Sequence, residues 1–110
     1  MAEIFALLFS YGSLQGTEVQ QSAFGRELAG RRDHLRGYSL VAPGAGISPH
    51  ANIVRADDAQ RVAGTAFEVT EPELMAADEY ERRDGYVRVL GRLVSGRDAW
   101  VYVDARTIAR

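Results

Sequence analysis

The sequence predicts an α+β fold in which about six short strands outnumber two helices. The 11 glycines are scattered over 110 residues, which indicates many turns and therefore many short elements. Short segments between these turns are apolar or alternate with polar residues, a pattern typical of strands. Because the connections are short, the pattern favours a small mixed sheet or a barrel. The length predicts one domain covering residues 1–110.

The N-terminal half begins with an apolar run, a turn and a helix. Residues 4–9 are continuously apolar, which predicts a strand buried on both faces. Apolar residues at helical spacing predict a helix over residues 20–29, with Gly30 as its stop. Further strands are expected at 37–41, 51–55, 61–69, 86–94 and 99–103, with a loop at 43–46 and turns at 84–85 and 95–98.

A second helix is expected to begin after Thr70 and to end near Arg82. Thr70 is a favourable N-cap residue, and Pro72 suits the first turn of a helix. Glu71 and Glu73 complement the positive end of the helix dipole. This segment is the clearest helix start in the chain.

The acidic residues of this helix divide between two faces. Counted at about 100° per residue from Leu74, Asp78 lies at about 40° and Glu81 at about 340°. Both therefore share the face that is expected to pack on the sheet, whereas Glu79, at about 140°, is expected in solvent. Partial burial raises the pKa of a carboxylate toward values useful for general acid–base catalysis. Asp78 and Glu81 are thus candidate catalytic groups, or else flank residues paired with nearby arginines.

The segment Tyr11-Gly12-Ser13-Leu14 directly follows the first predicted strand. Gly12 lets a ligand approach the main chain closely. A turn here can direct successive N–H groups at one point, forming a nest that binds an anion or a carboxylate. The alternative interpretation is an ordinary tight turn.

Tyr86 and Arg88 begin a later strand and share one of its faces, with Val87 on the other. Arg88 is placed to orient a helix carboxylate through a bidentate contact. The alternative is an exposed strand arginine.

Composition excludes several kinds of chemistry. The chain has no cysteine, and all 13 of its basic residues are arginine. Lysine Schiff bases, cysteine nucleophiles, thiolate–metal sites and disulfides are therefore impossible. His34 and His50 are too few and too far apart for a metal site, so no bound metal is expected. The net charge of −2 argues against nucleic-acid binding, and the apolar run is too short to span a membrane. A cytoplasmic location is expected.

Four arginines lie between Arg26 and Arg36. Acidic residues interrupt them, which favours a solvated helix face. A surface that binds nucleic acid or protein is the alternative, and steeply salt-dependent binding would support it.

Several motifs occur in a recognisable order along the chain. They are Phe9-Ser10-Tyr11-Gly12-Ser13-Leu14, Gly37-Tyr38-Ser39-Leu40 with Ser48-Pro49, the segment Val62-Ala63-Gly64-Thr65-Ala66-Phe67-Glu68-Val69, and Asp78-Glu79-Tyr80-Glu81 followed by Tyr86-Val87-Arg88. From about Leu8 to Val103 the chain resembles the γ-glutamylcyclotransferase-like family, which includes the avirulence-induced-gene-like proteins. The resemblance implies a small β-barrel with flanking helices.

The resemblance also implies roles for individual residues. Glu81 matches the family's catalytic glutamate, the acid–base residue. Asp78 matches the aspartate that precedes it, whose role is structural. The loop from Tyr11 to Leu14 would hold a γ-glutamyl group through its backbone, and Tyr86 and Arg88 match positions that line or brace the site.

Two positions depart from the family pattern. Ala77 stands where members often have leucine, and Arg82 stands where they often have glycine. Arg82 and its neighbour Arg83 would lie at the cavity rim and bear on the choice of substrate.

The resemblance implies a cofactor-independent enzyme that releases 5-oxoproline and a free amine from a small γ-glutamyl substrate by intramolecular aminolysis. The alternative is a non-catalytic protein that binds a γ-glutamyl or other carboxylate metabolite in the same cavity, because a shared fold does not fix an activity. We expect a monomer or a homodimer, with no nucleic-acid or membrane partner.

Overall fold

The computed structural model describes residues 4–42 and 51–107, so the expected loop at 43–46 lies outside the described residues. Two α-helices and two single 3-10 turns accompany seven strands in the described part of the chain. The elements are β1 (Ala6–Ser10), η1 (Ser13–Gln15), α1 (Thr17–Phe24), β2 (Gly30–Arg36), β3 (Tyr38–Val41), β4 (Asn52–Arg55), β5 (Arg61–Val69), α2 (Glu71–Arg82), β6 (Tyr86–Arg92), β7 (Asp98–Asp104) and η2 (Ala105–Thr107). Neither described α-helix is long and apolar enough to cross a membrane.

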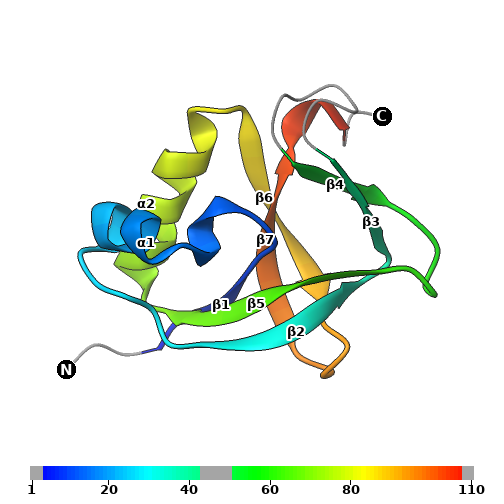
Figure 1. The fold of residues 1–110 in the computed structure, drawn as a ribbon, viewed down its shortest axis with the longest axis horizontal. Coiled ribbons are helices and arrows are strands. Elements are labelled where there is room, and N and C mark those ends of the chain that lie inside the picture. Colours follow the sequence, from blue (N-terminus) through cyan, green and yellow to red (C-terminus); the bar gives the residue numbers. More distant parts are fainter. Residues whose placement is uncertain (1–3, 43–50, 108–110) are drawn as a thin grey trace.

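Five strands form a mixed sheet in the order β2-β5-β1-β7-β6, and β3 pairs with β4 in a separate two-stranded sheet (Figure 1). All ladders are antiparallel except the one between β1 and β7, where Leu8 pairs with Trp100. The first and last strands of the chain are therefore neighbours near the centre of the main sheet. The α+β class that the sequence predicts is confirmed.

The expectation of a β-barrel is wrong in one respect, because the main sheet is not closed. Its edge strands, β2 and β6, approach each other at one end through an isolated bridge between Leu35 and Leu93. Beside this bridge, the backbone N–H of Val94 donates to the carbonyl of His34 at 2.8 Å. β3 follows directly after β2, and the small sheet of β3 and β4 lies beside the main sheet (Figure 1), so the whole resembles a barrel split along one seam between β2 and β6.

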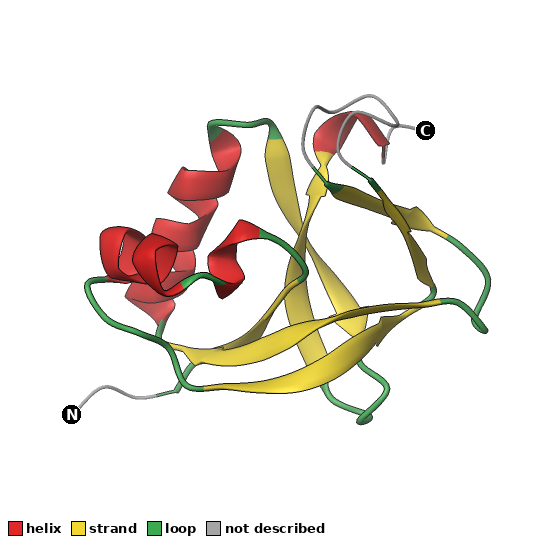
Figure 2. Cartoon of the chain, viewed as in Figure 1, coloured by secondary structure: helices red, strands yellow, loops and turns green. Residues whose placement is uncertain are grey.

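Side chains of the apolar run at the start of the chain pack into two separate hydrophobic cores. Leu7 and Phe9 face the inside of the curved main sheet, whereas Leu8 faces the opposite side, where the helices pack. Both helices lie together on one side of the strands (Figure 2). Both faces of β1 are thus covered, which explains why this strand is continuously apolar. Ile4 and Phe5 precede the strand and are exposed, so the strand is shorter than the run.

Helix α2 has the bounds that its sequence predicts. The Thr70 side chain accepts a hydrogen bond from the Glu73 N–H, and the Glu73 side chain accepts one from the Thr70 N–H, which completes a capping box. Leu74 and Ala77 are buried against the sheet, and Glu79 is exposed. The predicted faces of this helix are confirmed.

The first helix differs from its prediction. It spans Thr17–Phe24 and ends at Gly25, whose φ of 75° is open to glycine and strained for other residues. The predicted stop at Gly30 lies five residues too late, because buried Leu28 extends the apolar pattern beyond the helix.

The arginine-rich segment forms a strand, so its interpretation as a solvated helix face is wrong. Residues 30–36 are β2, an edge strand in which only Leu35 is buried. With one apolar side chain pointing inward, alternation is too weak to predict a strand. Arg26 lies between α1 and β2 and pairs with Glu73 of α2, with an Nε to Oε2 distance of 2.5 Å.

Strand β5 passes very close to the end of β1 at Gly64. A Cβ atom at this position would lie 2.3 Å from the Ser10 carbonyl oxygen and 2.6 Å from Cζ of Phe9. Only glycine fits this approach without a shift of the backbone. The contact lies where β1 ends and the Tyr11–Leu14 loop begins.

Candidate active site

A cavity of about 340 Å³ opens where β1, α2, β6 and β7 come together. Its lining contains two carboxylates, four tyrosines and the loop that follows β1. The lining residues are Phe9, Ser10, Tyr11, Gly12, Ser13, Leu14, Ala51, Tyr80, Glu81, Asp84, Tyr86 and Tyr102. The structure thus brings together six of the eight residues that the sequence analysis singled out, and places Asp78 and Arg88 behind the wall.

The Tyr11–Leu14 loop forms one side of the cavity. The Leu14 side chain is buried and anchors the loop, while the Gly12 N–H donates to the Ser10 hydroxyl at 3.2 Å. The N–H groups of Ser13 and Leu14 begin a single 3-10 turn and donate to no other residue within the described chain. A Cβ atom at Gly12 would meet no protein atom within 4 Å. The loop therefore offers an unobstructed stretch of backbone with available donors.

Glu81 also lines the cavity, from the last turn of α2. Its side chain is partly buried, and no hydrogen bond or ion pair reaches its carboxylate from residues 4–42 or 51–107. Burial, with a smaller contribution from the negative charge of Asp84, raises the pKa of Glu81 to about 7. The group can therefore take up and release a proton near neutral pH, as a general acid–base catalyst must.

The raised pKa has a consequence for stability: Glu81→Gln is expected to stabilise the fold above pH 7 by about 1–3 kcal/mol. The folded-state pKa of about 7 lies above the usual 4.5, so the folded protein holds this proton more tightly than the unfolded chain. The wild type accordingly loses stability as the pH rises from about 4.5 to about 7, and the neutral amide does not. Urea unfolding of both proteins at about pH 5 and pH 8 measures this, and an equal difference at the two pH values would contradict it.

Asp78 and Arg88 support the cavity wall from outside. Asp78 accepts a hydrogen bond of 2.6 Å from the hydroxyl of Tyr102, a lining residue, and pairs with Nε of Arg88 at 3.2 Å. The Arg88 guanidinium lies 4.5 Å from the ring centre of Trp100, in cation–π contact. Arg88 thus contacts a helix carboxylate as the sequence suggests, but through one ion pair between Nε and Oδ1 and not through the expected bidentate hydrogen bonds. The contact braces Tyr102.

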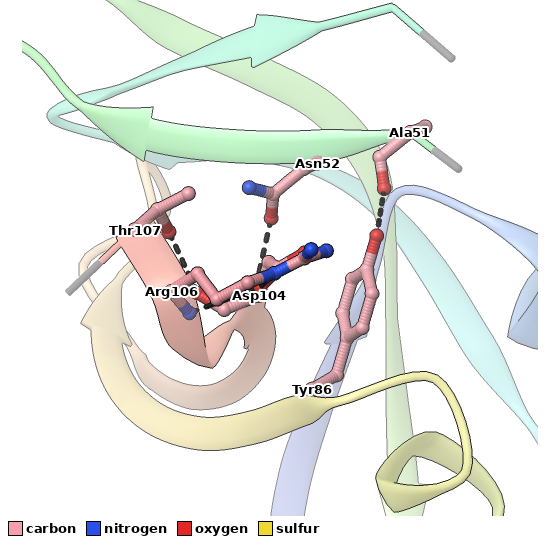
Figure 3. A network of polar contacts seen from close by, with 6 residues as sticks. All are labelled: Ala51, Asn52, Tyr86, Asp104, Arg106 and Thr107. Atoms are coloured by element: carbon pink, nitrogen blue, oxygen red, sulfur yellow. Dashed lines mark hydrogen bonds and ion pairs between the residues drawn. The ribbon is translucent and has the colours of Figure 1, made fainter. Parts of the chain in front are cut away.

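Tyr86 ties the cavity to the small sheet through a polar network (Figure 3). Its hydroxyl donates to the carbonyl of Ala51 at 2.6 Å. The adjacent Asn52 accepts from the N–H of Asp104 at 3.0 Å, and the buried carboxylate of Asp104 accepts from the guanidinium of Arg106 at 2.6 and 2.9 Å. The end of β7 thereby holds the start of β4 against the cavity.

Asp104→Asn is expected to lower the free energy of unfolding by about 1 kcal/mol at pH 7. The Arg106 guanidinium lowers the pKa of Asp104, so the ion pair stabilises the fold above the usual pKa of 3.8 and is lost as the pH falls through the folded-state value. The stabilities of wild type and variant should therefore converge as the pH falls below 3.8. Asp98→Asn removes an exposed pair with Arg92 and serves as the control, with an expected change within about 0.5 kcal/mol. If Asp98→Asn lowered the free energy of unfolding more than Asp104→Asn, the burial of the Asp104 carboxylate would not explain its contribution to stability.

Arg82 and Arg83 do not line the cavity in the described structure. Arg82 pairs with the exposed Glu79, with an Nη1 to Oε1 distance of 2.5 Å, and both side chains are largely in solvent. Arg83 is exposed at the C-cap of α2. Their expected place at the rim beside the substrate is therefore not supported.

Sequence reasoning missed several lining residues. Tyr80 lies on α2 beside Glu81, and its hydroxyl is 3.1 Å from the Ser13 hydroxyl across the mouth of the cavity. Tyr102 could have been found from alternation along the last strand, which places it on the same face as Trp100. No local signal identifies Ala51, since its place depends on the pairing of distant segments. Among the described residues, no group of three or more His, Asp or Glu side chains is arranged to hold a metal ion.

Comparison with known families matches residues 8–108 to the model of "Gamma-glutamyl cyclotransferase, AIG2-like" proteins. The chain belongs to the AIG2-like gamma-glutamyl cyclotransferase family. The resemblance drawn from the sequence motifs is thereby confirmed. A search among curated proteins finds no match.

Several solved structures share the fold of this AIG2-like chain. A solution structure from Arabidopsis thaliana superimposes with a TM-score of 0.81 at 22% identity, covering 99% of this chain and 68% of the other. An uncharacterized protein from Pyrococcus horikoshii gives a TM-score of 0.65 at 20% identity, with 90% and 77% covered. A structure named gamma-glutamyl cyclotransferase gives 0.64 at 20% identity, with 89% and 65% covered. At these identities the likeness establishes the fold.

Proposed function

We propose that this protein is a γ-glutamyl amine cyclotransferase, with Glu81 as its general acid–base catalyst. The observation that carries the proposal is a carboxylate with a pKa of about 7 and no partner among the described side chains, which lines the same cavity of about 340 Å³ as an open backbone loop. Membership of the family supports the reaction type. The identity of the amine is left to experiment.

The reaction is an intramolecular aminolysis. The α-amino nitrogen of the substrate attacks its own γ-carbonyl carbon, forming the lactam C–N bond of 5-oxoproline. The bond from the γ-carbon to the departing nitrogen then breaks, and a free amine leaves. Nucleophile and electrophile belong to one molecule, so holding the curled conformation contributes much of the rate enhancement. No water is consumed in the balance.

The proton balance gives Glu81 two tasks. The α-amino group of the substrate is mostly protonated at neutral pH and cannot attack in that form. As a carboxylate, Glu81 accepts a proton from this ammonium group, and as a carboxylic acid it donates that proton to the departing nitrogen. The attacking nitrogen loses a second proton when it becomes the lactam nitrogen, and Glu81, again a carboxylate, passes this proton to the released amine, which leaves as an ammonium ion. A pKa of about 7 keeps both forms accessible near neutral pH.

The loop supplies hydrogen-bond donors for the negatively charged oxygen atoms of the substrate. The N–H groups of Ser13 and Leu14 are available to an anionic oxygen of the substrate, either its α-carboxylate or the oxyanion that develops on the γ-carbonyl. The open space at Gly12 allows this oxygen to approach the main chain. Binding through backbone donors needs no cationic side chain in the cavity.

Incubation with a panel of γ-glutamyl amides tests the proposal. The panel should include γ-glutamyl amino acids, γ-glutamyl polyamines and γ-glutamyl-ε-lysine, with release of 5-oxoproline measured by mass spectrometry. We expect at least one member to be converted with equal amounts of 5-oxoproline and amine. Thermal stabilisation by a γ-glutamyl compound without release of 5-oxoproline would favour the non-catalytic binding protein.

A further inference from the structure

The carbonyl of Gly12 is held by one residue in two ways. The backbone N–H of Gln15 donates to it at 3.1 Å, and the side-chain amide of Gln15 donates to it at 3.3 Å. The oxygen of the same side-chain amide accepts a hydrogen bond of 2.9 Å from the Thr65 hydroxyl on β5. Gln15 thus links the loop to the neighbouring strand of the main sheet.

A second glutamine holds the following part of the loop. Gln20 of α1 is only 2% exposed, and its side-chain amide donates to the Leu14 carbonyl at 2.8 Å. Its oxygen accepts from the backbone N–H of Leu28, also at 2.8 Å. The peptide unit of Leu14 and Gln15 is therefore fixed, and its N–H is the one that donates to the Gly12 carbonyl.

The orientation of one peptide group follows from these contacts. In a planar trans peptide the C=O and N–H bonds point in opposite directions. Because Gln15 holds the Gly12 carbonyl, the N–H of Ser13 in the same peptide unit points away from Gln15. This N–H has no partner in the described chain, and both Gly12 and Ser13 line the cavity.

We propose that Gln15, held by Thr65, is a positioning residue that orients the Gly12–Ser13 peptide so that the Ser13 N–H is presented to an anionic oxygen of the ligand. The choice of a γ-glutamyl ligand rests on the proposed function; the orientation of the peptide does not. Without the side-chain contacts, this peptide would have to be ordered when the ligand binds, which weakens binding.

Two substitutions of Thr65 separate positioning from packing. Thr65→Val keeps the shape of the side chain and removes the hydroxyl, whereas Thr65→Ser keeps the hydroxyl and removes a methyl group. Positioning predicts that Thr65→Val weakens ligand binding about five- to tenfold, the loss expected from one hydrogen bond, and that Thr65→Ser binds as the wild type. Packing alone predicts the reverse order, with Thr65→Ser the more affected.

Affinity should be measured by calorimetry in the Glu81→Gln background, so that the γ-glutamyl amide under test is not consumed. Steady-state kinetics with Glu81 intact should show a raised KM for Thr65→Val and an unchanged midpoint of the pH profile. Equal affinities of the Thr65→Val and Thr65→Ser proteins would overturn the proposal.

Backbone amide NMR of the free protein keeps this test independent of the proposed function. In Thr65→Val the amide signals of residues 12–14 should broaden or shift more than those of the rest of the sheet, and in Thr65→Ser they should match the wild type. Unchanged signals in Thr65→Val would overturn the positioning role even if no γ-glutamyl compound binds. If the amide signals change in Thr65→Val but no γ-glutamyl compound binds, the positioning role of Gln15 is retained and the proposed substrate class is refuted.

Discussion

Glu81→Gln is expected to reduce the release of 5-oxoproline by about 10²- to 10⁴-fold, the usual contribution of a general acid–base group. The amide has nearly the same shape, but it cannot accept the proton from the α-ammonium of the substrate or donate one to the departing nitrogen. Since Glu81 makes no hydrogen bond or ion pair with the described side chains, the fold should be retained. The rate of 5-oxoproline formation and circular dichroism measured on the same preparation test both parts.

Glu79→Gln is the matched control, because it makes the same chemical change two residues away on the exposed face of α2. Its carboxylate contacts only Arg82 among the described residues, and such exposed pairs contribute little to stability. We expect its activity to lie within about twofold of the wild type. If Glu81→Gln retained full activity, or if both variants lost activity equally, the assignment of Glu81 would fail.

Gly64→Ala is expected to lower the free energy of unfolding by about 3 kcal/mol or more. The added methyl group would lie 2.3 Å from the Ser10 carbonyl oxygen, a backbone atom that cannot move without displacing the end of β1. The disturbance would spread to the cavity, because Ser10 and the next four residues line it. Urea unfolding measures the loss, and failure to obtain folded protein is the extreme of the same result.

Gly12→Ala is the control for this substitution. Its methyl group would meet no protein atom within 4 Å, so the stability should change by less than about 1 kcal/mol. The same methyl group would occupy space beside the loop backbone, so the KM for a γ-glutamyl amide should rise. If Gly12→Ala and Gly64→Ala lowered the free energy of unfolding equally, the close contact at Gly64 would not be the cause of the destabilisation.

The parts of the site that local patterns encode could be predicted from the sequence. The capping residues around Thr70 fix where α2 begins, and the helical repeat then places Glu81 on the buried side and Glu79 on the exposed side. Strand β5 is likewise predicted with its observed bounds, because Val62, Phe67 and Val69 are separated by polar or small residues in a pattern close to that of a strand. Local capping and periodicity decide these elements, and tertiary contacts do not override them.

Other features depend on pairings that no local pattern reveals. Strand β2 has one buried apolar residue, Leu35, so its place at the sheet edge is visible only through its ladder with β5. In the sequence Gln20 looks like an ordinary polar helix residue. Its burial depends on hydrogen bonds with the backbone of Leu14 and Leu28, which no local pattern predicts. The open seam between β2 and β6 also follows from the curvature of the sheet, which the order of the strands along the chain does not specify.

The parallel pairing of β1 with β7 bears on how the protein folds during synthesis. Leu8 meets Trp100, so the ladder that completes the centre of the sheet joins residues from opposite ends of the sequence. Contacts of such large sequence separation slow folding, because the loop entropy must be lost before the contacts form. Until β7 emerges from the ribosome, one edge of β1 remains unpaired and open to wrong partners. The cavity, whose wall includes Tyr102, therefore cannot assemble until β7 has emerged.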